Sequence, residues 1–520
     1  MAAWWQSGVV YQVYPRSFQD SDGDGTGDLK GITRRLEYLR WLGVDAAWIS
    51  TIYPSPMTDF GYDVADYCGI DPVFGTMADF DALVARAHEL GLKVILDFVP
   101  NHSSDHHPWF QASRRREGGK AEWYIWRDGA AGGGLPNNWL ANFGGSAWTW
   151  DAIRGQYYYH SFLPTQPDLN WRNPAVRAAM YDVLRFWLER GVDGFRVDVL
   201  WMMIKDDQFR DNPRNPDWTP GMSSHDRLVP LYTADRPEVH AIVAEMRAVL
   251  DAFGERVLIG EIYLPIERLV TYYGDGAGAH LPFNFQLLLL QDWSAQALAA
   301  VITRYEAALP ADAWPNWVLG NHDRPRIATR VGPAQARVAA VLLLTLRGTP
   351  TVYMGDELGM VDTPIPPGEV RDPAELRQPG KGLGRDPVRT PFPWEGGPGR
   401  GFTTGTPWLR FGDDVPLERQ ADDQRSMLSL YRTLIALRRA FTALSVGALS
   451  DVTTEGTVLA YERSGGGERF VVALNLGGAE AGCTVPQGQV VASTHGAWAS
   501  TVGGLLTLRA DEGVVIRRTT

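Results

Sequence analysis

Carboxylate and imidazole side chains stand at the ends of several short apolar segments of the sequence. Asp198, Glu261 and Asp323 each end or closely follow such a segment, and His102 and His322 stand in similar places. Acidic groups and imidazoles gathered from several segments are what general acid–base or nucleophilic catalysis requires. Any one carboxylate at such a place could equally cap the next helix. The catalytic interpretation therefore depends on their occurrence together.

A second group of acidic residues lies in the stretch DSDGDGTGDLKG, residues 20–31. Carboxylates at alternate positions can wrap one hard cation, which predicts a structural Ca²⁺ or, alternatively, Mg²⁺. The other interpretation is an exposed acidic turn without an ion. The stretch is not an EF-hand, because Gly31 stands where the bidentate glutamate belongs and a strand-like segment precedes it. The expected ligands are Asp20, Asp22, Asp24, the carbonyl of Thr26, and Asp28.

Eight short apolar segments run along the chain, several of them separated by segments with helical spacing. This alternation indicates parallel strands joined by helical crossovers. Eight units favour an α/β fold of the closed (β/α)8 TIM-barrel type over an open doubly wound sheet. The C-terminal ends of such strands form one face, where the carboxylates would meet. The segments comprise residues 9–14, 46–50, 93–99, 194–199, 256–262, 281–285, 316–320 and 349–354.

Two parts of the chain fall outside the barrel pattern. Residues 103–165 are rich in Gly, Trp, Tyr and Asn, and their length predicts an inserted subdomain after the third strand. Residues 446–520 contain short strands and Gly-rich turns, which indicate a C-terminal antiparallel β-domain. The catalytic barrel is therefore assigned to residues 1–102 and 166–445. A polar, Pro-rich stretch within it, residues 203–235, is expected to frame the pocket.

The overall composition limits the classes of binding partner and the cellular location that we expect. The formal net charge of −12 and the pI of about 5.4 disfavour nucleic acid or an anionic membrane as the main partner. The two cysteines lie far apart, and the spacing of His102, His106 and His107 fits no zinc pattern. We expect a cytoplasmic protein, because no signal-like N-terminus or bilayer-length apolar run occurs. The sequence does not indicate the oligomeric state.

A series of motifs occurs in a fixed order along the chain. They are GYDVADY (61–67), DFVPNHSS (97–104), QPDLNW (166–171), DGFRVDV (193–199), GEIY (260–263), GNHD (320–323), GTPTVYMGDELGM (348–360), RDPVRTPFPWE (385–395) and GFTTGTPWL (401–409). Together they resemble the α-amylase superfamily of glycoside hydrolases, and most closely its α-glucosidase and oligo-1,6-glucosidase branch. The resemblance runs from about residue 4 to residue 440 and implies a (β/α)8 barrel.

The resemblance implies a retaining mechanism with three carboxylates. Asp198 is the expected nucleophile, Glu261 the expected acid/base, and Asp323 the carboxylate that holds sugar hydroxyls. A retaining glycosidase needs one ionised carboxylate and one protonated carboxyl group, and Glu261 therefore needs a raised pKa. Arg196 lies two residues before Asp198 and shares its face of the strand. We expect Arg196 to keep Asp198 ionised.

The resemblance also implies a closed subsite for the terminal glucose. Asp59 and Arg389 are expected to pair and grip its outer hydroxyls, which would block longer chains and make the enzyme exo-acting. The rings of Tyr62 and Phe162 are expected to stack on the sugar, with core packing as the alternative. The remaining expected contacts are hydrogen bonds from His102, Gln166 and His322, and an aromatic wall at Phe143.

Val199, the residue after the expected nucleophile, modestly favours α-1,6-linked, isomaltose-type substrates. In the related branch, valine there tends to accompany α-1,6 linkages, although one methyl group contributes little energy. Phe392 and Pro393 stand where the family commonly has Met and Gln, and Asp356 stands where it often has Gln or Glu. These departures leave the second sugar, or a non-sugar aglycone, unassigned.

The expected function is an exo-acting, retaining α-glucosidase that takes α-glucose from the non-reducing end of short oligosaccharides. The first alternative is an α-glucosyl transferase or sucrose isomerase that uses the same glucosyl-enzyme. The second is a non-catalytic homologue that serves as a transporter subunit. Such subunits lack the catalytic carboxylates and carry a transmembrane helix, which disfavours this alternative here.

Overall fold

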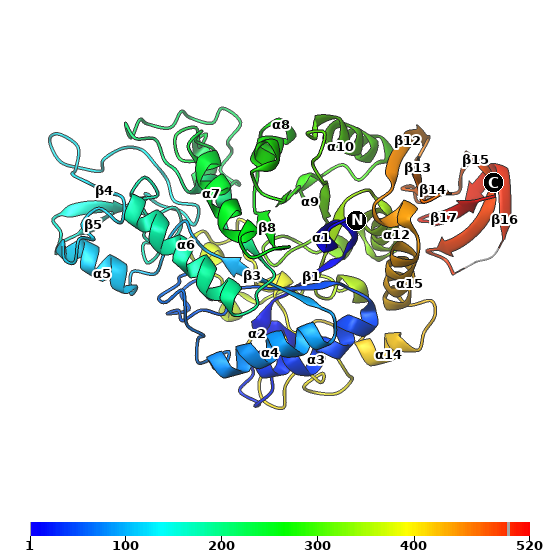
Figure 1. Ribbon diagram of the computed structural model, residues 1–520, viewed down its shortest axis with the longest axis horizontal. Helices are drawn as coiled ribbons and strands as arrows, with labels where there is room; N and C mark the ends of the chain where they lie inside the picture. The colour runs from blue at the N-terminus through cyan, green and yellow to red at the C-terminus, as the bar shows by residue number, and fades with distance from the viewer. Residues whose placement is uncertain (1, 497–499, 520) are drawn as a thin grey trace.

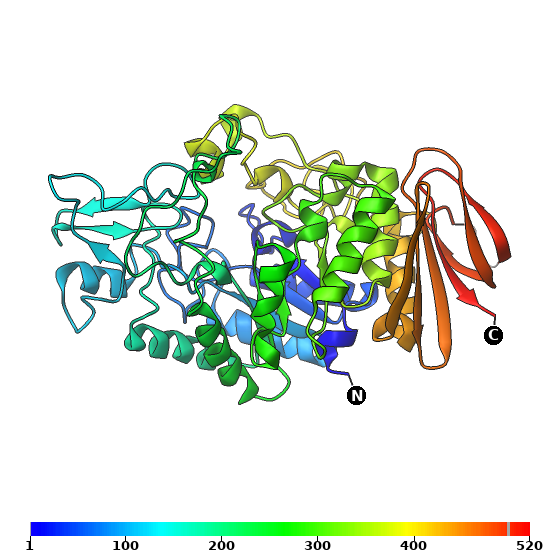
Figure 2. The same ribbon diagram turned by 90° about the horizontal axis from the view of Figure 1, so that it is seen from above.

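Eight parallel strands form the central sheet of the computed structural model, which describes residues 2–496 and 500–519. Their order is β10-β11-β1-β2-β3-β7-β8-β9, and helices surround them (Figure 1, Figure 2). The (β/α)8 barrel predicted from the sequence is confirmed. The strands are β1 (Val10–Val13), β2 (Ala46–Ile49), β3 (Lys93–Phe98), β7 (Gly194–Val197), β8 (Val257–Gly260), β9 (Leu281–Pro282), β10 (Asn316–Val318) and β11 (Thr349–Tyr353).

The barrel closes between β9 and β10 through a side chain. Asn316 Nδ2 donates to the carbonyl of Pro282 at 2.5 Å, and Asn316 Oδ1 accepts from the N–H of Asn284 at 2.8 Å. Among the described residues, no main-chain ladder joins these two strands. Pro282 has no N–H to donate to a ladder. This is consistent with the strand expected at residues 281–285 being only two residues long.

The crossover helices begin and end at local sequence signals. Asp28 accepts a hydrogen bond from the Gly31 N–H at the start of α3, and Gly43 ends this helix with a left-handed φ of 99°. Thr76 and Asp79 form a capping box at the start of α4. The crossover helices are α3 (Leu29–Leu42), α4 (Met77–Glu89), α6 (Pro174–Glu189), α7 (Val239–Asp251), α8 (Ile266–Leu269), α10 (Ala295–Ala308), α12 (Pro333–Thr345) and α15 (Met427–Ala440).

Shorter helices occupy the loops around the barrel. They are α1 (Trp4–Ser7), α2 (Pro15–Phe18), α9 (Gln286–Leu289), α11 (Ile327–Val331), α13 (Pro373–Arg377), α14 (Leu417–Ala421) and α16 (Thr442–Ser445). The stretch 203–235 contains one 3-10 turn, His225–Arg227, and an isolated antiparallel bridge between Arg214 and Leu228.

After β3 the chain leaves the barrel and forms a small lobe at one end of the molecule (Figure 1). This lobe contains α5 (Pro108–Arg115) and an antiparallel sheet of β4 (Trp126–Arg127), β6 (Gln156–Tyr159) and β5 (Trp148–Asp151). The ring of Phe110 packs on those of Trp126 and Tyr158, with centroids 5.5 and 5.2 Å apart. These elements all lie within the stretch 103–165 that the sequence assigns to an insertion.

The C-terminal part forms an antiparallel sheet at the other end of the molecule (Figure 2). Its strand order is β12-β13-β14-β17-β15-β16, which confirms the predicted antiparallel β-domain. Thr520, the end of the predicted domain, lies outside the described residues, as does Met1. The strands are β12 (Ala448–Glu455), β13 (Val458–Gly465), β14 (Glu468–Asn475), β15 (Ala481–Ser493), β16 (Thr501–Leu508) and β17 (Gly513–Arg518).

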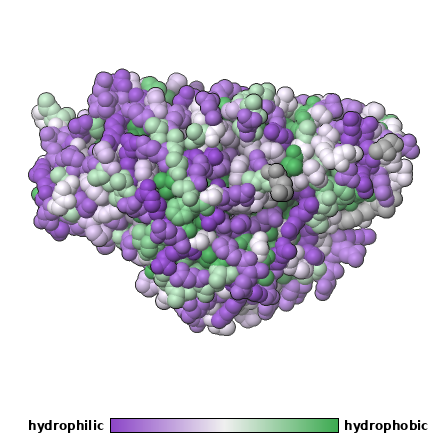
Figure 3. All heavy atoms as spheres, in the orientation of Figure 1, coloured by the Kyte–Doolittle hydropathy of each residue, from purple (hydrophilic) through white to green (hydrophobic). Residues whose placement is uncertain are grey.

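The face of the molecule shown in Figure 3 is mainly hydrophilic, with hydrophobic residues interspersed. Among the described residues, no helix is both long and apolar enough to cross a membrane.

Candidate active site

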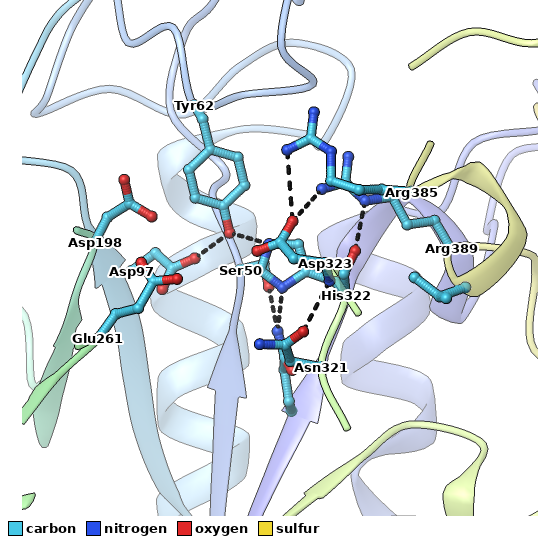
Figure 4. Close-up of polar contacts among 12 residues, drawn as sticks. Ser50, Tyr62, Asp97, Asp198, Glu261, Asn321, His322, Asp323, Arg385 and Arg389 are labelled. Carbon is cyan, nitrogen blue, oxygen red and sulfur yellow. Dashed lines mark hydrogen bonds and ion pairs between the residues drawn. The ribbon is translucent and has the colours of Figure 1, made fainter. Parts of the chain in front are cut away.

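A cavity of about 400 Å³ lies at the C-terminal ends of the barrel strands. Asp198 directly follows β7, Glu261 directly follows β8, and Asp323 lies beyond β10. All three side chains line the cavity, and Figure 4 shows them on either side of Tyr62. The structure therefore brings together the three residues that the sequence predicts as catalytic.

The guanidinium group of Arg196 binds two of these carboxylates. Its Nη1 lies 2.7 Å from Asp198 Oδ1, and its Nη2 lies 2.7 Å from Glu261 Oε2. Nη1 also lies 3.4 Å from Asp97 Oδ1, on β3. The predicted contact between Arg196 and Asp198 is present, and Arg196 additionally fixes Glu261. One buried cation is thus shared by three buried carboxyl groups.

Burial raises the pKa of Asp198, and Arg196 lowers it again only in part. Arg196 is therefore placed to favour the ionised form of Asp198, as expected, while burial opposes it. Burial also raises the pKa of Glu261, against Arg196, and the charges of Asp323 and Asp97 raise it further. Because Asp198 and Glu261 interact closely, they titrate as a pair, and a retaining mechanism requires one proton between them. Asp198 is the ionised member when that proton resides on Glu261.

The oxygens of Glu261 differ in their surroundings. Oε2 accepts hydrogen bonds from the main-chain N–H of Val199, at 2.8 Å, and from Arg196. No hydrogen bond reaches Oε1 from any described residue. A proton on Glu261 therefore belongs on Oε1, the oxygen left free to face a leaving group.

The Val199 backbone is left-handed, with φ 39° and ψ 44°, which is strained for a β-branched residue.

Asp323 is surrounded by cationic and imidazole groups. Arg389 Nη2 lies 2.7 Å from Asp323 Oδ1, Arg385 Nη1 lies 3.5 Å from the same oxygen, and His322 Nε2 lies 3.4 Å from Oδ2. Burial alone would raise its pKa, but His322, Arg389 and Arg385 together hold the pKa well below its usual range. Asp323 is therefore ionised and can accept hydrogen bonds from a ligand.

Asp59 pairs with Arg385, and the predicted pair of Asp59 with Arg389 is wrong. Arg385 Nη2 donates to Asp59 Oδ1 at 2.6 Å, whereas Arg389 binds Asp323 and donates from Nε to the carbonyl of His322 at 2.8 Å. The two arginines flank a 3-10 turn, Asp386–Val388, so both approach the cavity from one side. Sequence spacing alone could not assign the two arginines to the two carboxylates.

The predicted hydrogen-bonding residues lie in two places. His102 lines the cavity with Tyr62, and its Nε2 lies 3.0 Å from the carbonyl oxygen of Tyr62. Gln166 lies behind the wall, where its Nε2 donates to Asp59 at 3.0 Å and its Oε1 accepts from the Leu163 N–H. His322 also lies behind the wall, in contact with Tyr62. Gln166 thus orients Asp59, which faces the cavity.

The predicted aromatic residues all line the cavity. The rings of Phe143 and Phe162 meet edge to face, with centroids 5.5 Å apart, and Arg385 lies 5.0 Å from the centroid of Phe143. Tyr62 stacks on His322, with centroids 5.4 Å apart and 9° between the ring planes. One flank of the cavity is therefore aromatic, and Phe143 belongs to the inserted lobe.

Comparison with known proteins places this barrel in a family. The family described as "Alpha amylase, catalytic domain" matches residues 12–447. The chain belongs to the α-amylase family. It is 42% identical to a probable alpha-glucosidase of Rhizobium meliloti (strain 1021), over 91% of this chain and 89% of that protein. It is also 42% identical to maltase 1 of Drosophila virilis, over 88% of this chain and 76% of that protein.

Solved structures extend the likeness beyond the α-amylase catalytic domain. The alpha-glucosyl transfer enzyme XgtA superposes with a TM-score of 0.94 at 40% identity, with both chains fully covered. The trehalulose synthase MutB of Pseudomonas mesoacidophila MX-45 gives a TM-score of 0.90 at 34% identity, over 99% of this chain and all of that one. A MutB variant has been solved in complex with its substrate sucrose.

Several residues of this α-amylase-family site are missed by the sequence analysis. Asp97 and Arg385 stand within quoted motifs and Gln12 within the first apolar segment, but none of them was given a role, because neither a motif nor an apolar run shows which side chains point inward. On the opposite flank of the cavity, His225, Asp226 and Pro230 belong to the stretch 203–235 that was expected to frame the pocket, whereas Trp201, Met202, Tyr263 and Arg324 were given no role.

The acidic stretch after β1 gathers part of the predicted metal site. Carboxylate oxygens of Asp20, Asp22 and Asp28 lie within 4.8 Å of one another, close enough for one cation to contact all three. Asp24 lies outside this group, and its Oδ1 accepts from the Thr26 N–H at 2.7 Å. Hydrogen bonds from Thr403 and from loop N–H groups outweigh burial and lower the pKa of Asp20. Asp20 is thus charged at neutral pH.

Proposed function

We propose that this protein is a retaining, exo-acting α-glucosidase that releases α-glucose from the non-reducing end of short oligosaccharides. The observation that carries the proposal is the position of the Asp59–Arg385 ion pair. Both residues line the same cavity as Asp198, Glu261 and Asp323. A charged pair at this place supplies hydrogen-bonding groups for the outer hydroxyls of one glucose and leaves no path for a longer chain.

The first step forms a glucosyl-enzyme. An oxygen of Asp198 attacks the anomeric carbon, while Glu261 passes its proton from Oε1 to the glycosidic oxygen as the bond to the leaving group breaks. The transition state carries positive charge on the ring, and the ionised Asp323 stabilises that charge while it holds the sugar hydroxyls. Arg196 keeps both reacting carboxyl groups in position.

The second step releases the glucose. Glu261, now ionised, takes a proton from water, and the water oxygen attacks the anomeric carbon from the side that the leaving group vacated. The ester to Asp198 breaks, and the product keeps the α configuration. The pair of carboxyl groups then again holds one proton on Glu261. The free Oε1 of Glu261 suits both proton transfers.

Transglucosylation is the second candidate activity, and the likeness to XgtA and MutB favours it. In this reaction an acceptor hydroxyl replaces water in the second step, with Glu261 again taking the proton. The flank formed by Trp201, Tyr263 and Arg324 would hold the acceptor. Arg324 lies 4.9 Å from the centroid of the Tyr263 ring, which gives that flank both an apolar surface and N–H donors.

An α-1,6 preference is the proposal for the linkage. It is supported by Val199, whose side chain lines the cavity next to the nucleophile. We also propose one structural Ca²⁺, or Mg²⁺, held by the acidic loop. Asp20, Asp22 and Asp28 would supply charged oxygen ligands, and Asp24 and the Thr26 carbonyl complete the predicted set. The cation would stabilise the loop after β1. A cytoplasmic location remains our expectation from the sequence.

The deciding experiment compares maltose, isomaltose and sucrose as substrates of the wild type and of Asp198→Ala. Chromatography of the products separates hydrolysis, which gives free glucose, from transfer or isomerisation, which gives new glucosides. The ¹H NMR spectrum of the first product shows whether α-glucose appears before mutarotation. A wild type that acts on none of the three, or that first releases β-glucose, would contradict the proposal.

A further inference from the structure

A chain of hydrogen bonds runs from β1 to β3 behind the cavity. Gln12 Nε2 lies 2.7 Å from His322 Nδ1, and His322 Nε2 lies 2.7 Å from the Tyr62 hydroxyl. That hydroxyl lies 2.6 Å from Asp97 Oδ2, and Asp97 Oδ1 faces Arg196 at 3.4 Å. Figure 4 shows the part from Tyr62 to Asp97 and His322. The chain thus joins a β1 amide to the arginine that holds the reacting carboxyl groups.

Two carboxylates determine which atoms donate and which accept along this chain of hydrogen bonds. Asp97 Oδ2 accepts the Tyr62 proton when Asp97 is ionised, so the Tyr62 oxygen is left to accept from His322 Nε2. Asp323 Oδ2 also lies 3.4 Å from that nitrogen, and a lone pair on Nε2 would face its negative charge. The contacts of His322 with Tyr62 and with Asp323 therefore both require the imidazole proton to lie on Nε2.

His322 is a neutral imidazole with a single N–H. Burial, with the charges of Arg389, Arg196 and Arg385, lowers its pKa well below the usual range, against the effect of Asp323. Since Nε2 carries the proton, Nδ1 must accept a hydrogen bond. Several groups from different elements face or surround His322. They are Tyr14 directly after β1, Trp48 on β2, Asp97 on β3, Arg196 on β7, and Tyr62, Asp323, Arg385 and Arg389 in the loops.

We propose that Gln12 is a positioning residue, whose side-chain N–H fixes the tautomer of His322 so that Nε2–H points toward Tyr62 and Asp323. This role depends on the proposed function, because Tyr62 and Asp323 act on the glucose there. Gln12 Nε2 also donates to Ser50 Oγ at 3.2 Å, so both of its N–H groups have a partner when the amide nitrogen faces His322.

The unpartnered oxygen of Gln12 supports a functional reason for this amide. Gln12 is fully buried, and no described group donates to its Oε1. A buried polar atom without a partner destabilises the fold. An apolar residue of similar size would avoid that cost but would offer no N–H to Nδ1. With the proton on Nδ1 instead, Tyr62 would turn its hydroxyl toward Nε2, and Asp97 would lose a donor beside Arg196.

The tautomer is measured directly by long-range ¹H–¹⁵N correlation NMR on full-length protein with ¹⁵N-labelled histidine. The signals of His322 are assigned from their loss in His322→Gln. The expected result is an unprotonated Nδ1 and a protonated Nε2 in the wild type. In Gln12→Met the two tautomers are expected to mix. A protonated Nδ1 in the wild type, or an unchanged tautomer in Gln12→Met, would overturn the proposal.

Gln12→Glu gives a kinetic readout that a merely structural role would not produce. The new carboxylate raises the pKa of His322 and binds Nδ1–H. Below that pKa the imidazolium keeps Nε2–H; above it, only Nδ1–H remains. The kcat/KM of this variant is therefore expected to fall about tenfold as pH rises through the His322 pKa, at a lower pH than the alkaline limb of the wild type.

Gln296→Glu, at an exposed position, is the control and is expected to keep the wild-type profile. A Gln12→Glu profile that matches the wild type would overturn the proposal. Thermal melts of Gln12→Met and Gln12→Glu separate loss of folding from loss of positioning. The NMR result is independent of substrate, so failure of the α-glucosidase proposal would be seen separately, as a missing activity with the tautomer intact.

Discussion

Arg385 donates to Asp59 at 2.6 Å while its Nε lies 2.7 Å from Asp372. Three acidic groups, Asp59, Asp372 and Asp323, thus share this guanidinium, and they outweigh burial to raise its pKa well above the usual value. Arg385 also contacts the ring of Phe143. The Arg385 side chain therefore connects the loop after β11 to the loop after β2 and to the inserted lobe. It also holds one end of the cavity in place.

Arg385→Ala is expected to lower kcat/KM for disaccharides about a hundredfold, mainly through KM. The variant leaves Asp59 buried without its cation, and truncating one partner of a buried charge pair commonly costs about 2–5 kcal/mol. Steady-state kinetics with maltose and isomaltose measures the effect. The opened end should also raise activity on longer chains relative to disaccharides.

Arg304→Ala is the matched control, because it breaks an exposed pair with Glu267 and should leave the kinetics unchanged. Arg389→Ala should instead lower kcat, since Arg389 holds Asp323. Equal KM effects from Arg385→Ala and Arg389→Ala would contradict the assignment of the two arginines.

The sequence predicts the scaffold well because repeated patterns encode it. Each barrel strand except the one at 281–285 appears near its expected place, since runs of buried apolar residues are a local signal. The strand at 281–285 is shorter than expected because of Pro282, and a side-chain hydrogen bond from Asn316 joins it to β10. Hydrophobic periodicity cannot predict either feature. The carboxylates were predictable because they follow strands. The pairing of Asp59 with Arg385 was not, because two arginines four residues apart both satisfy the same spacing.

Asp97→Asn is expected to shift the alkaline limb of the kcat/KM profile to lower pH. The charge of Asp97 is one of the groups that raise the pKa of Glu261. With that charge removed, the protonated form of Glu261 is less favoured, so its pKa falls. Glu261 then loses its catalytic proton at a lower pH. Kinetics from about pH 4 to pH 9 would show this, and a shift to higher pH would contradict the role of Asp97.

Val199→Ala is expected to change linkage preference while it leaves the mechanism intact. The side chain lines the cavity, but the contact with Glu261 comes from the main-chain N–H, which alanine retains. The ratio of kcat/KM for isomaltose to that for maltose should fall by up to about tenfold, the effect of small apolar groups in a pocket. Val415→Ala, at an exposed position, is the control. An unchanged ratio would mean that the loops on the opposite flank determine linkage.

Metal removal is expected to lower the melting temperature without altering the fold at low temperature. A ligand that binds only the native state stabilises it by about 2.7 kcal/mol at a hundredfold excess over its Kd. Thermal melts compare the chelator-stripped protein with and without added Ca²⁺ or Mg²⁺. Asp22→Asn should abolish the response to the cation, and Asp312→Asn, at an exposed position outside the loop, should retain it. A stripped wild type that melts at the same temperature with and without cation would contradict the site.

Lys205→Met is expected to destabilise the protein by about 3–5 kcal/mol, because it leaves a buried carboxylate unpaired. Lys205 is almost fully buried, forms an ion pair with Asp168 and donates to Asn101 Oδ1 at 2.7 Å. Asn101 in turn contacts His102 at 3.1 Å, so KM for the glucoside should also rise. The double variant Lys205→Met with Asp168→Asn should recover much of the stability, since no unpaired charge remains. Chemical denaturation of Lys205→Met, Asp168→Asn and the double variant measures this coupling, and strictly additive losses would show that the two residues act independently.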